Sequence, residues 1–185
     1  IEEEAFIPSK SSYEVLKAEM GKLLYVNENG ILYLMFEGNV YEIKLDSLKV
    51  EKIVKNLEAG CYATSYDNQY FSWVDVDSQY STTELSVMNL KTKEVIKINK
   101  GDDQYLRPLG FIGNDFIYGV ANAADVISDA AGNTTFPMHS IIIMDVTDQT
   151  QLKEYTPASG YVDSIAIDDY TINVNLIAAS NGVYT

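Results

Sequence analysis

Residues 85–98 read LSVMNLKTKEVIKI: an apolar run, a short polar turn, and a strand in which apolar and polar residues alternate. Residues 40–53, VYEIKLDSLKVEKI, align with them without a gap, and residues 141–153, IIIMDVTDQTQLK, form a third copy. Each copy predicts two antiparallel strands joined by a tight turn. A repeat of about 40–50 residues is typical of propeller and solenoid arrays.

A second repeated element precedes each of these copies. Residues 24–34, 64–74 and 110–120 each contain an apolar strand, a turn of Asn, Asp or Gly, and another apolar strand. A fourth copy at 164–174 is not followed by a second half. We therefore expect three four-stranded units and one half unit. Their bounds are 22–60, 61–104, 105–159 with an insertion at 122–137, and 160–185.

The N-terminal segment, residues 1–21, is open to two interpretations. Ser11 and Glu14 have the spacing of a capping box, and Gly21 could end a short helix. The alternative is an inner strand over residues 13–19. The apolar positions Tyr13, Val15 and Ala18 do not decide between the two periods.

The turn-flanked strand pair at 84–95 resembles the outer hairpin of the TolB-like and peptidase-associated propellers of bacteria. The resemblance covers most of the chain and lies in hydrophobic pattern and turn placement. No Trp-Asp pair ends a strand, which departs from the WD40 pattern. The resemblance implies an all-β, propeller-like array of four-stranded antiparallel blades in an incomplete ring. An irregular β-sandwich or solenoid is the alternative.

The same resemblance implies a non-catalytic binding module of a larger bacterial envelope or extracellular protein, for which a lipoprotein is one form. The alternative function is the substrate-gating domain of a larger hydrolase, such as a peptidase, whose catalytic domain lies outside this chain. A purely structural interaction module is a third reading. The start without methionine and the half unit at the end both lead us to expect a longer parent protein.

The acidic net charge of the chain argues against negatively charged partners. The 185 residues include 13 basic and 27 acidic ones, for a net charge of −14. Such a chain repels phosphate backbones and anionic lipids, so we expect no nucleic-acid partner. No apolar run approaches the roughly 18 residues of a membrane-spanning helix, so no membrane span is expected.

The residues needed for familiar catalytic or metal chemistry are scarce. His139 is the only histidine, Cys61 is the only cysteine, and no Gly-x-Ser-x-Gly elbow occurs. A calcium loop starting at Asp75 would need Gly and Glu where Tyr80 and Ser86 stand. We predict no catalytic residue, metal or cofactor in this chain.

Binding is expected where the loops gather. In an antiparallel blade, the loops between the second and third strands share one end of the sheet with the blade-to-blade connections. The longest loops, 75–82 and 122–137, and the connection 101–105 all belong to that end. Loops on a rigid scaffold commonly carry binding sites. The candidates for a protein or small polar ligand are Asp75, Asp77, Tyr80, Asp102, Asp103 and Tyr105.

The incomplete ring has a further consequence. Residues 141–143, three isoleucines without polar alternation, predict a strand that is buried on both faces. Three and a half blades fall short of the usual four to eight, so one apolar blade face would stay open to water. We expect this open blade face to be covered by a longer parent protein or by self-association with a second copy.

Overall fold

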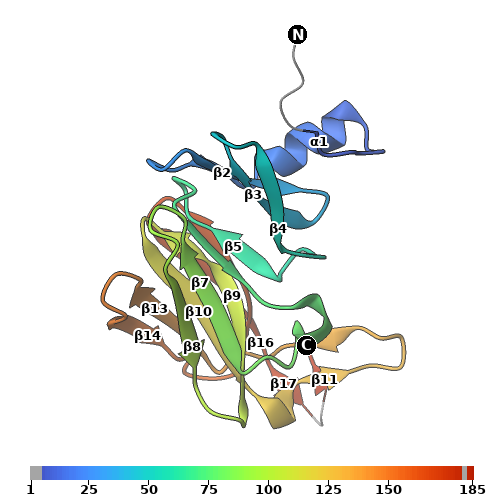
Figure 1. Cartoon of the computed structure of the whole chain (residues 1–185). Helices are drawn as coiled ribbons and strands as arrows, with labels where there is room; N and C mark the ends of the chain where they lie inside the picture. Colours follow the sequence, from blue (N-terminus) through green and yellow to red (C-terminus); the bar gives the residue numbers. More distant parts are fainter. Residues whose placement is uncertain (1–5, 181–182) are drawn as a thin grey trace.

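The computed structural model of the protein describes residues 6–180 and 183–185. The described chain folds into consecutive antiparallel sheets (Figure 1). Sheet 1 contains β1 (Leu24–Val26), β2 (Ile31–Phe36), β3 (Asn39–Lys44) and β4 (Lys49–Val54). Sheet 2 contains β5 (Tyr62–Thr64), β6 (Tyr70–Trp73), β7 (Glu84–Asn89) and β8 (Val95–Asn99).

Sheet 3 contains β9 (Gln104–Ile112), β10 (Asp115–Asn122), β13 (Ser140–Asp145) and β14 (Gln151–Tyr155). Half sheet 4 is the pair β15 (Tyr161–Asp168) and β16 (Thr171–Ile177). In sheets 1 to 3 the strands pair in chain order. The loop between β10 and β13 holds the 3-10 turn η2 (Ala123–Asp125) and the small hairpin β11 (Ile127–Ser128) and β12 (Thr134–Thr135). A 3-10 turn η1 (Val76–Ser78) follows β6, and β17 (Ala179–Ser180) pairs with β18 (Val183–Tyr184).

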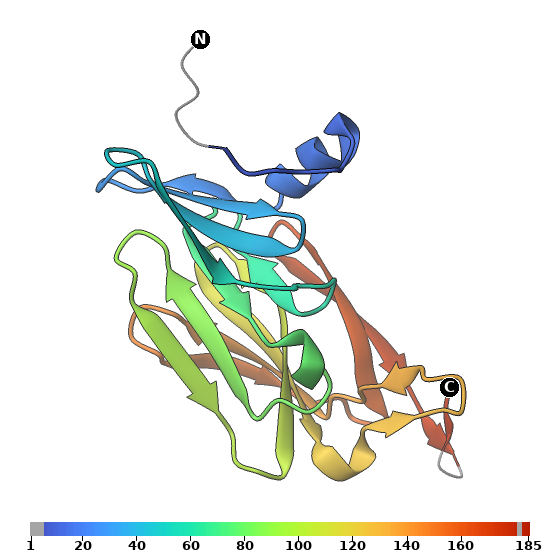
Figure 2. The ribbon, with the colours of Figure 1, turned by 45° about the vertical axis from the view of Figure 1, so that its right-hand side comes forward.

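The first strands of sheet 2, sheet 3 and half sheet 4 lie side by side on the inner side of the array. β9 contacts both β5 and β15. The backbone of Gly110 in β9 lies so close to β15 that a Cβ there would collide with Ile167 Cδ1. From these inner strands the sheets fan outward (Figure 2). The fold is therefore an incomplete, all-β propeller of four-stranded antiparallel blades.

The apolar core continues from blade to blade. The larger cluster runs through sheets 1, 2 and 3, and its largest fully buried side chains include Tyr33, Phe71 and Phe116. A smaller cluster joins sheet 3 to half sheet 4 through Met138 and Val162. Each fully buried side chain of this size stabilises the fold by about 1.5–3 kcal/mol. Packing between sheets, and not only within them, thus holds the array together.

Half sheet 4 covers most of the face of sheet 3 that carries residues 141–143. Ile141 and Ile142 are buried, and Ile143 is half-buried. Ile141 and Ile143 pack in the same cluster as Val162 of β15 and Ile172 of β16. An apolar hollow remains between sheet 3 and half sheet 4, and its lining includes Ile112, Ile143 and Val174.

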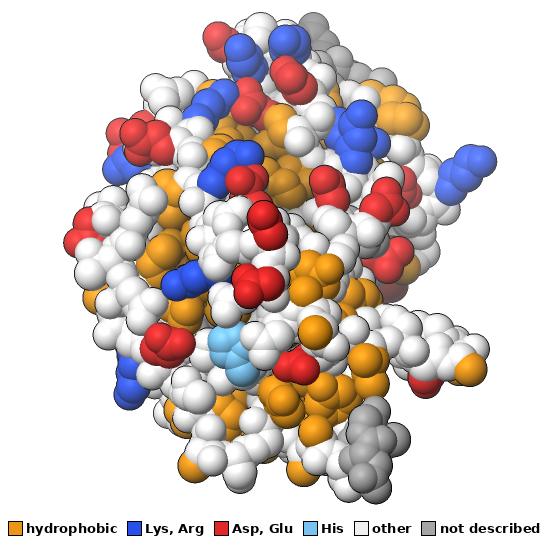
Figure 3. Space-filling view, turned by 90° about the horizontal axis from the view of Figure 1, so that it is seen from below, with side chains coloured by type: hydrophobic (Ala, Val, Ile, Leu, Met, Phe, Trp, Pro, Cys, Tyr) orange, Lys and Arg blue, Asp and Glu red, His pale blue; other side chains and the backbone are white. Residues whose placement is uncertain are grey.

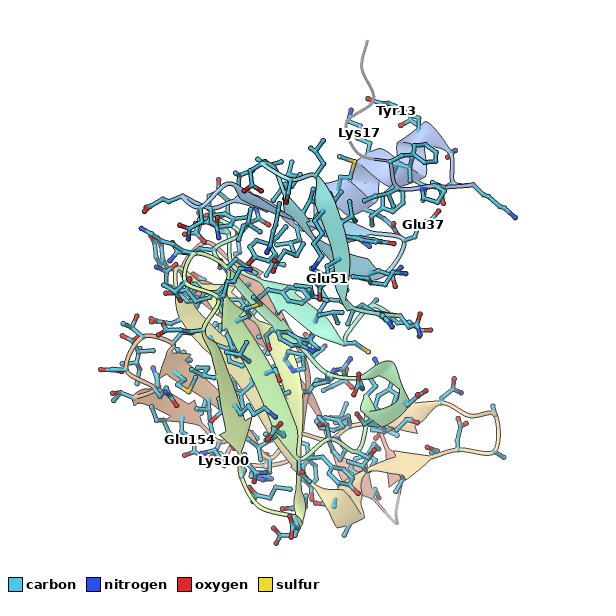
Figure 4. All side chains as sticks on the ribbon, viewed as in Figure 1. Tyr13, Lys17, Glu37, Glu51, Lys100 and Glu154 are labelled. Carbon is cyan, nitrogen blue, oxygen red and sulfur yellow. The ribbon has the colours of Figure 1, made fainter. Side chains whose placement is uncertain are left out.

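The N-terminal segment forms a helix, α1 (Tyr13–Met20), and not the alternative strand. α1 lies against β2; Tyr13 is its first residue, and Lys17 lies one turn further along the helix (Figure 4). No side chain of α1 is fully buried. Hydroxyl groups attach the segment instead: Ser9 Oγ donates to Glu37 Oε1 at 2.7 Å, and Ser11 Oγ does so at 2.8 Å. These bonds favour the ionised carboxylate and lower the pKa of Glu37.

The strand order gives the array two ends. The hairpin face carries the tight turns within each sheet, at 27–30, 45–48, 65–69, 90–94, 113–114, 146–150 and 169–170. The loop face carries the loops between second and third strands, at 37–38, 74–83 and 123–139, together with the sheet-to-sheet connections. No helix in the described part of the chain is long and apolar enough to cross a membrane.

Candidate functional site

Asp75 and Asp77 stand at a groove on the loop face. Both side chains are exposed, and they line a groove of about 280 Å³ between sheets 1 and 2. Trp73 at the end of β6 forms one wall, and Lys55 lies at the other after β4. The Trp73 ring stacks on Phe71, with 5.5 Å between the ring centroids. Packing on Phe71 therefore holds the indole in place, and Trp73 as a whole is half-buried.

This groove, which we call the 73–77 groove, combines groups that suit a polar ligand. Its two carboxylates can accept hydrogen bonds or balance a cation, and the Lys55 ammonium can donate. The indole offers a flat apolar surface for the ligand's carbon atoms. Among the described residues, no cluster of three or more His, Cys, Asp or Glu side chains could hold a metal ion.

Tyr80 and Tyr105 lie elsewhere on the loop face and point toward protein rather than solvent. Both rings are half-buried against the cluster that contains Phe136 and Met138. The Tyr80 and Phe136 ring centroids lie 6.5 Å apart. The Arg107 guanidinium lies 6.0 Å from the Phe136 ring on the same cluster. The two tyrosines therefore support the long insertion, and the structure does not bring them into the 73–77 groove.

Asp102 and Asp103 lie in the connection between β8 and β9, and both side chains are exposed. The Asp103 carbonyl accepts a hydrogen bond from the Ala123 N–H at 2.9 Å. This bond joins the connection to the start of the 122–137 insertion. The six predicted residues thus share one face but fall into three separate places on it. Figure 3 shows this side from below, with acidic and apolar side chains side by side around the single histidine.

Within residues 6–180 and 183–185, no serine hydroxyl is hydrogen-bonded to His139 Nε2. The His139 imidazole is half-buried, and in the described part of the chain Nε2 is buried without a hydrogen-bond partner. The neighbouring Ser140 Oγ is likewise buried and without a partner there. An activated serine needs a hydrogen bond to its base.

Sequence reasoning missed the residues that complete the groove, and it missed a second hollow altogether. Lys55 and Trp73 are separated in the sequence by the whole of β5. They line one groove only because sheets 1 and 2 lie next to each other. On the hairpin face, Tyr66, Phe111, Asp169 and Tyr170 line a hollow of about 450 Å³. The only sequence signal for it is a tyrosine in each of two turns that follow inner strands.

The sequence matches no family model and no curated protein. Among solved structures, the propeller domain of the Trilobed protease from Pyrococcus furiosus is similar, with a TM-score of 0.44 and 15% identity over 86% of this chain. The WD40 repeats of RRP9 match 78% of the chain, with a TM-score of 0.40 and 10% identity. The chain spans 50% and 41% of those structures, respectively. These likenesses concern the general plan of the fold.

Proposed function

We propose that the chain is a non-catalytic binding module of a larger envelope or extracellular propeller protein, and that the 73–77 groove receives a polar group of its ligand. The observation that carries the proposal is the meeting of Asp75, Asp77, Lys55 and Trp73 at one groove between two blades. Opposite charges and an aromatic wall suit a ligand that has both polar groups and an apolar face.

The scaffold supports this role. The groove walls belong to paired strands and a 3-10 turn, and Ser78 N–H donates to the Asp75 carbonyl at 3.0 Å. Gln79 Nε2 also donates to the Ala59 carbonyl at 3.2 Å, which joins the η1 loop to the connection between sheets 1 and 2. Walls fixed before the ligand arrives reduce the entropy cost of binding.

The test is a panel of amino acids, amino sugars and short polar peptides, added to ¹⁵N-labelled protein and followed by NMR. We expect one class of compound to shift the amide signals of residues 53–56 and 73–77 together. Asp75→Asn combined with Asp77→Asn should weaken that binding at least tenfold. Asp46→Asn, on the hairpin face, is the matched control.

Two outcomes would count against the proposal. Shifts confined to other parts of the chain would remove the 73–77 groove as the binding site. Turnover of any panel compound by the chain alone would contradict a non-catalytic role.

A further inference from the structure

Two tyrosines on the hairpin face have almost fully exposed side chains. Tyr66 is 98% exposed and Tyr170 is 86% exposed. They come from the turns of sheet 2 and half sheet 4, which lie far apart in the sequence, yet both line the hollow of about 450 Å³. That volume lies within the range of about 300–1,000 Å³ typical of ligand sites.

Both tyrosines are presented by ordered turns. In the first turn, Ser65 Oγ donates to Asp67 Oδ1 at 2.7 Å, and the Gln69 N–H donates to the same oxygen at 3.0 Å. Ser65 itself is only 2% exposed, so the turn is anchored in the core. The second turn is the two-residue link between β15 and β16, with Asp169 at φ +49°. The backbone that carries each ring is therefore ordered before a ligand arrives, which reduces the entropy cost of binding.

The floor and rim of the hollow differ in character. Phe111 and Ile167 form an apolar floor, and Asp169 supplies a carboxylate at the rim. Asp67 lies in the first turn and Asp168 is the last residue of β15, next to the second turn, and both residues are exposed. In the ion pairs of the described residues, none of these three carboxylates has a basic partner, whereas Lys91 and Lys93 of the same face are paired with Glu28 and Glu42.

We propose that this hollow binds a Lys or Arg side chain on a basic segment of a partner protein. Tyrosine faces attract a cation through the ring quadrupole, and the unpaired carboxylates add a charge opposite to that of the ligand. The net charge of −14 favours the approach of a basic partner from a distance. This site is separate from the 73–77 groove and extends the proposed function to a second ligand chemistry.

The test is fluorescence anisotropy with a labelled peptide of alternating Gly and Arg, compared with versions in which citrulline or Glu replaces Arg. We expect binding of the Arg peptide only, weaker at high salt. Tyr66→Ala and Tyr170→Ala should each reduce affinity about two- to fivefold, since each ring contributes one cation–π contact. Tyr66→Phe should retain the affinity, because the ring remains. Asp169→Asn should also weaken binding, because it removes the carboxylate. Asparagine tolerates the left-handed backbone at this position, so the turn should be kept.

Controls separate the two sites. Tyr13→Ala removes a tyrosine that is 73% exposed on α1, outside the hollow, and should leave binding unchanged. Equal affinity of the tyrosine variants and the wild type, or equal binding of the citrulline peptide, would overturn the inference. A loss seen only with Asp75→Asn and Asp77→Asn would move the peptide to the 73–77 groove. Binding of neutral oligosaccharides in place of the peptide would assign the hollow to sugars and overturn the proposal.

Discussion

Glu42 shows how one charged residue can join two blades. Its residue is 9% exposed in β3, and its carboxylate has partners from two sheets. Lys93 Nζ of sheet 2 lies 2.7 Å from Oε1, and the buried Tyr33 hydroxyl donates to Oε2 at 3.4 Å. A carboxylate so far from water is costly unless it is paired. The ion pair therefore stabilises the contact between sheet 1 and sheet 2.

Lys93→Met should lower the free energy of unfolding by about 1–3 kcal/mol, because it leaves the Glu42 carboxylate without its cation. Urea unfolding at pH 7 measures the change. Lys97→Met is the matched control: its 2.6 Å pair with Glu84 is 63% and 41% exposed, so the loss should be below about 1 kcal/mol. Equal losses in the two variants would show that the Glu42 pair contributes no more than a surface pair.

Tyr118 should make the free energy of unfolding fall at alkaline pH. Burial, and then the charge of Glu154, raise the pKa of Tyr118 to about 12, against 10.0 for the free side chain. Between these two values the unfolded chain loses the proton and the folded chain keeps it. The contribution of Tyr118 to stability is therefore complete below pH 10. It falls by about 1.4 kcal/mol per pH unit between the two pKa values. Burial and Glu42 raise the pKa of Tyr33 as well, so both tyrosines act in the same direction.

Tyr118→Phe should reduce the loss of stability between pH 9 and pH 11, because the phenol that must stay protonated is gone. Urea unfolding at the two pH values gives the slope. Tyr66→Phe removes a fully exposed hydroxyl and serves as the control. The same slope in Tyr118→Phe and in the wild type would contradict the assignment.

At the scale of elements, the turn between β2 and β3 depends on a glycine for two reasons. Gly38 has φ +66°, and a Cβ there would come within 2.9 Å of the Leu57 carbonyl oxygen. The Gly38 carbonyl also accepts the Leu57 N–H at 2.6 Å, so the connection after β4 cannot move away freely. Gly30, in the turn between β1 and β2, has the same φ of +66° with nothing within 4 Å of a Cβ.

This pair separates backbone strain from crowding. Gly30→Ala should cost about 1 kcal/mol, since only the left-handed backbone opposes it. Gly38→Ala should cost at least about 1 kcal/mol more, because the new methyl group meets backbone that is held in place. Thermal and urea unfolding of the two variants measure the difference. Equal costs would mean that the Leu57 segment adjusts freely.

The strands were predictable because their apolar pattern repeats. The alignment of residues 40–53 with 85–98 places β3, β4, β7 and β8 where the structure has them. The helix α1 was not decided by sequence, because no residue of it is fully buried and its apolar positions follow no clear period. Hydrogen bonds from Ser9 and Ser11 to Glu37 hold its segment, and such long-range bonds leave no local pattern.

At the scale of the whole molecule, the sites depend on which blades meet. Loop topology was enough to place Asp75 and Asp102 at one end of the array. Side-chain direction could not be read from the sequence, and Tyr80 and Tyr105 pack inward. The hairpin-face hollow needs Tyr66 and Tyr170, two blades apart. Only the fan of inner strands β5, β9 and β15 brings their turns together.

The array also ends in an incompletely covered surface. In the described residues, β16 pairs with β15 alone. A hollow of about 510 Å³ lies between this pair and sheet 3, and its apolar lining includes Ile112, Ile143 and Val174. Tyr155 at its edge is 41% exposed. A strand with a free edge beside an apolar hollow favours pairing with another strand.

We expect a second copy of the chain to cover this surface at high protein concentration. The net charge of −14 repels two copies at low ionic strength, so added salt should strengthen the association by screening. Sedimentation velocity over a range of concentrations, at low and high salt, measures it. Tyr155→Glu should shift the chain toward monomer, whereas Leu45→Glu, at a 45% exposed site in a sheet 1 turn, should not. A strict monomer under every condition would show that the open edge is tolerated in water, as the short edges of many sheets are.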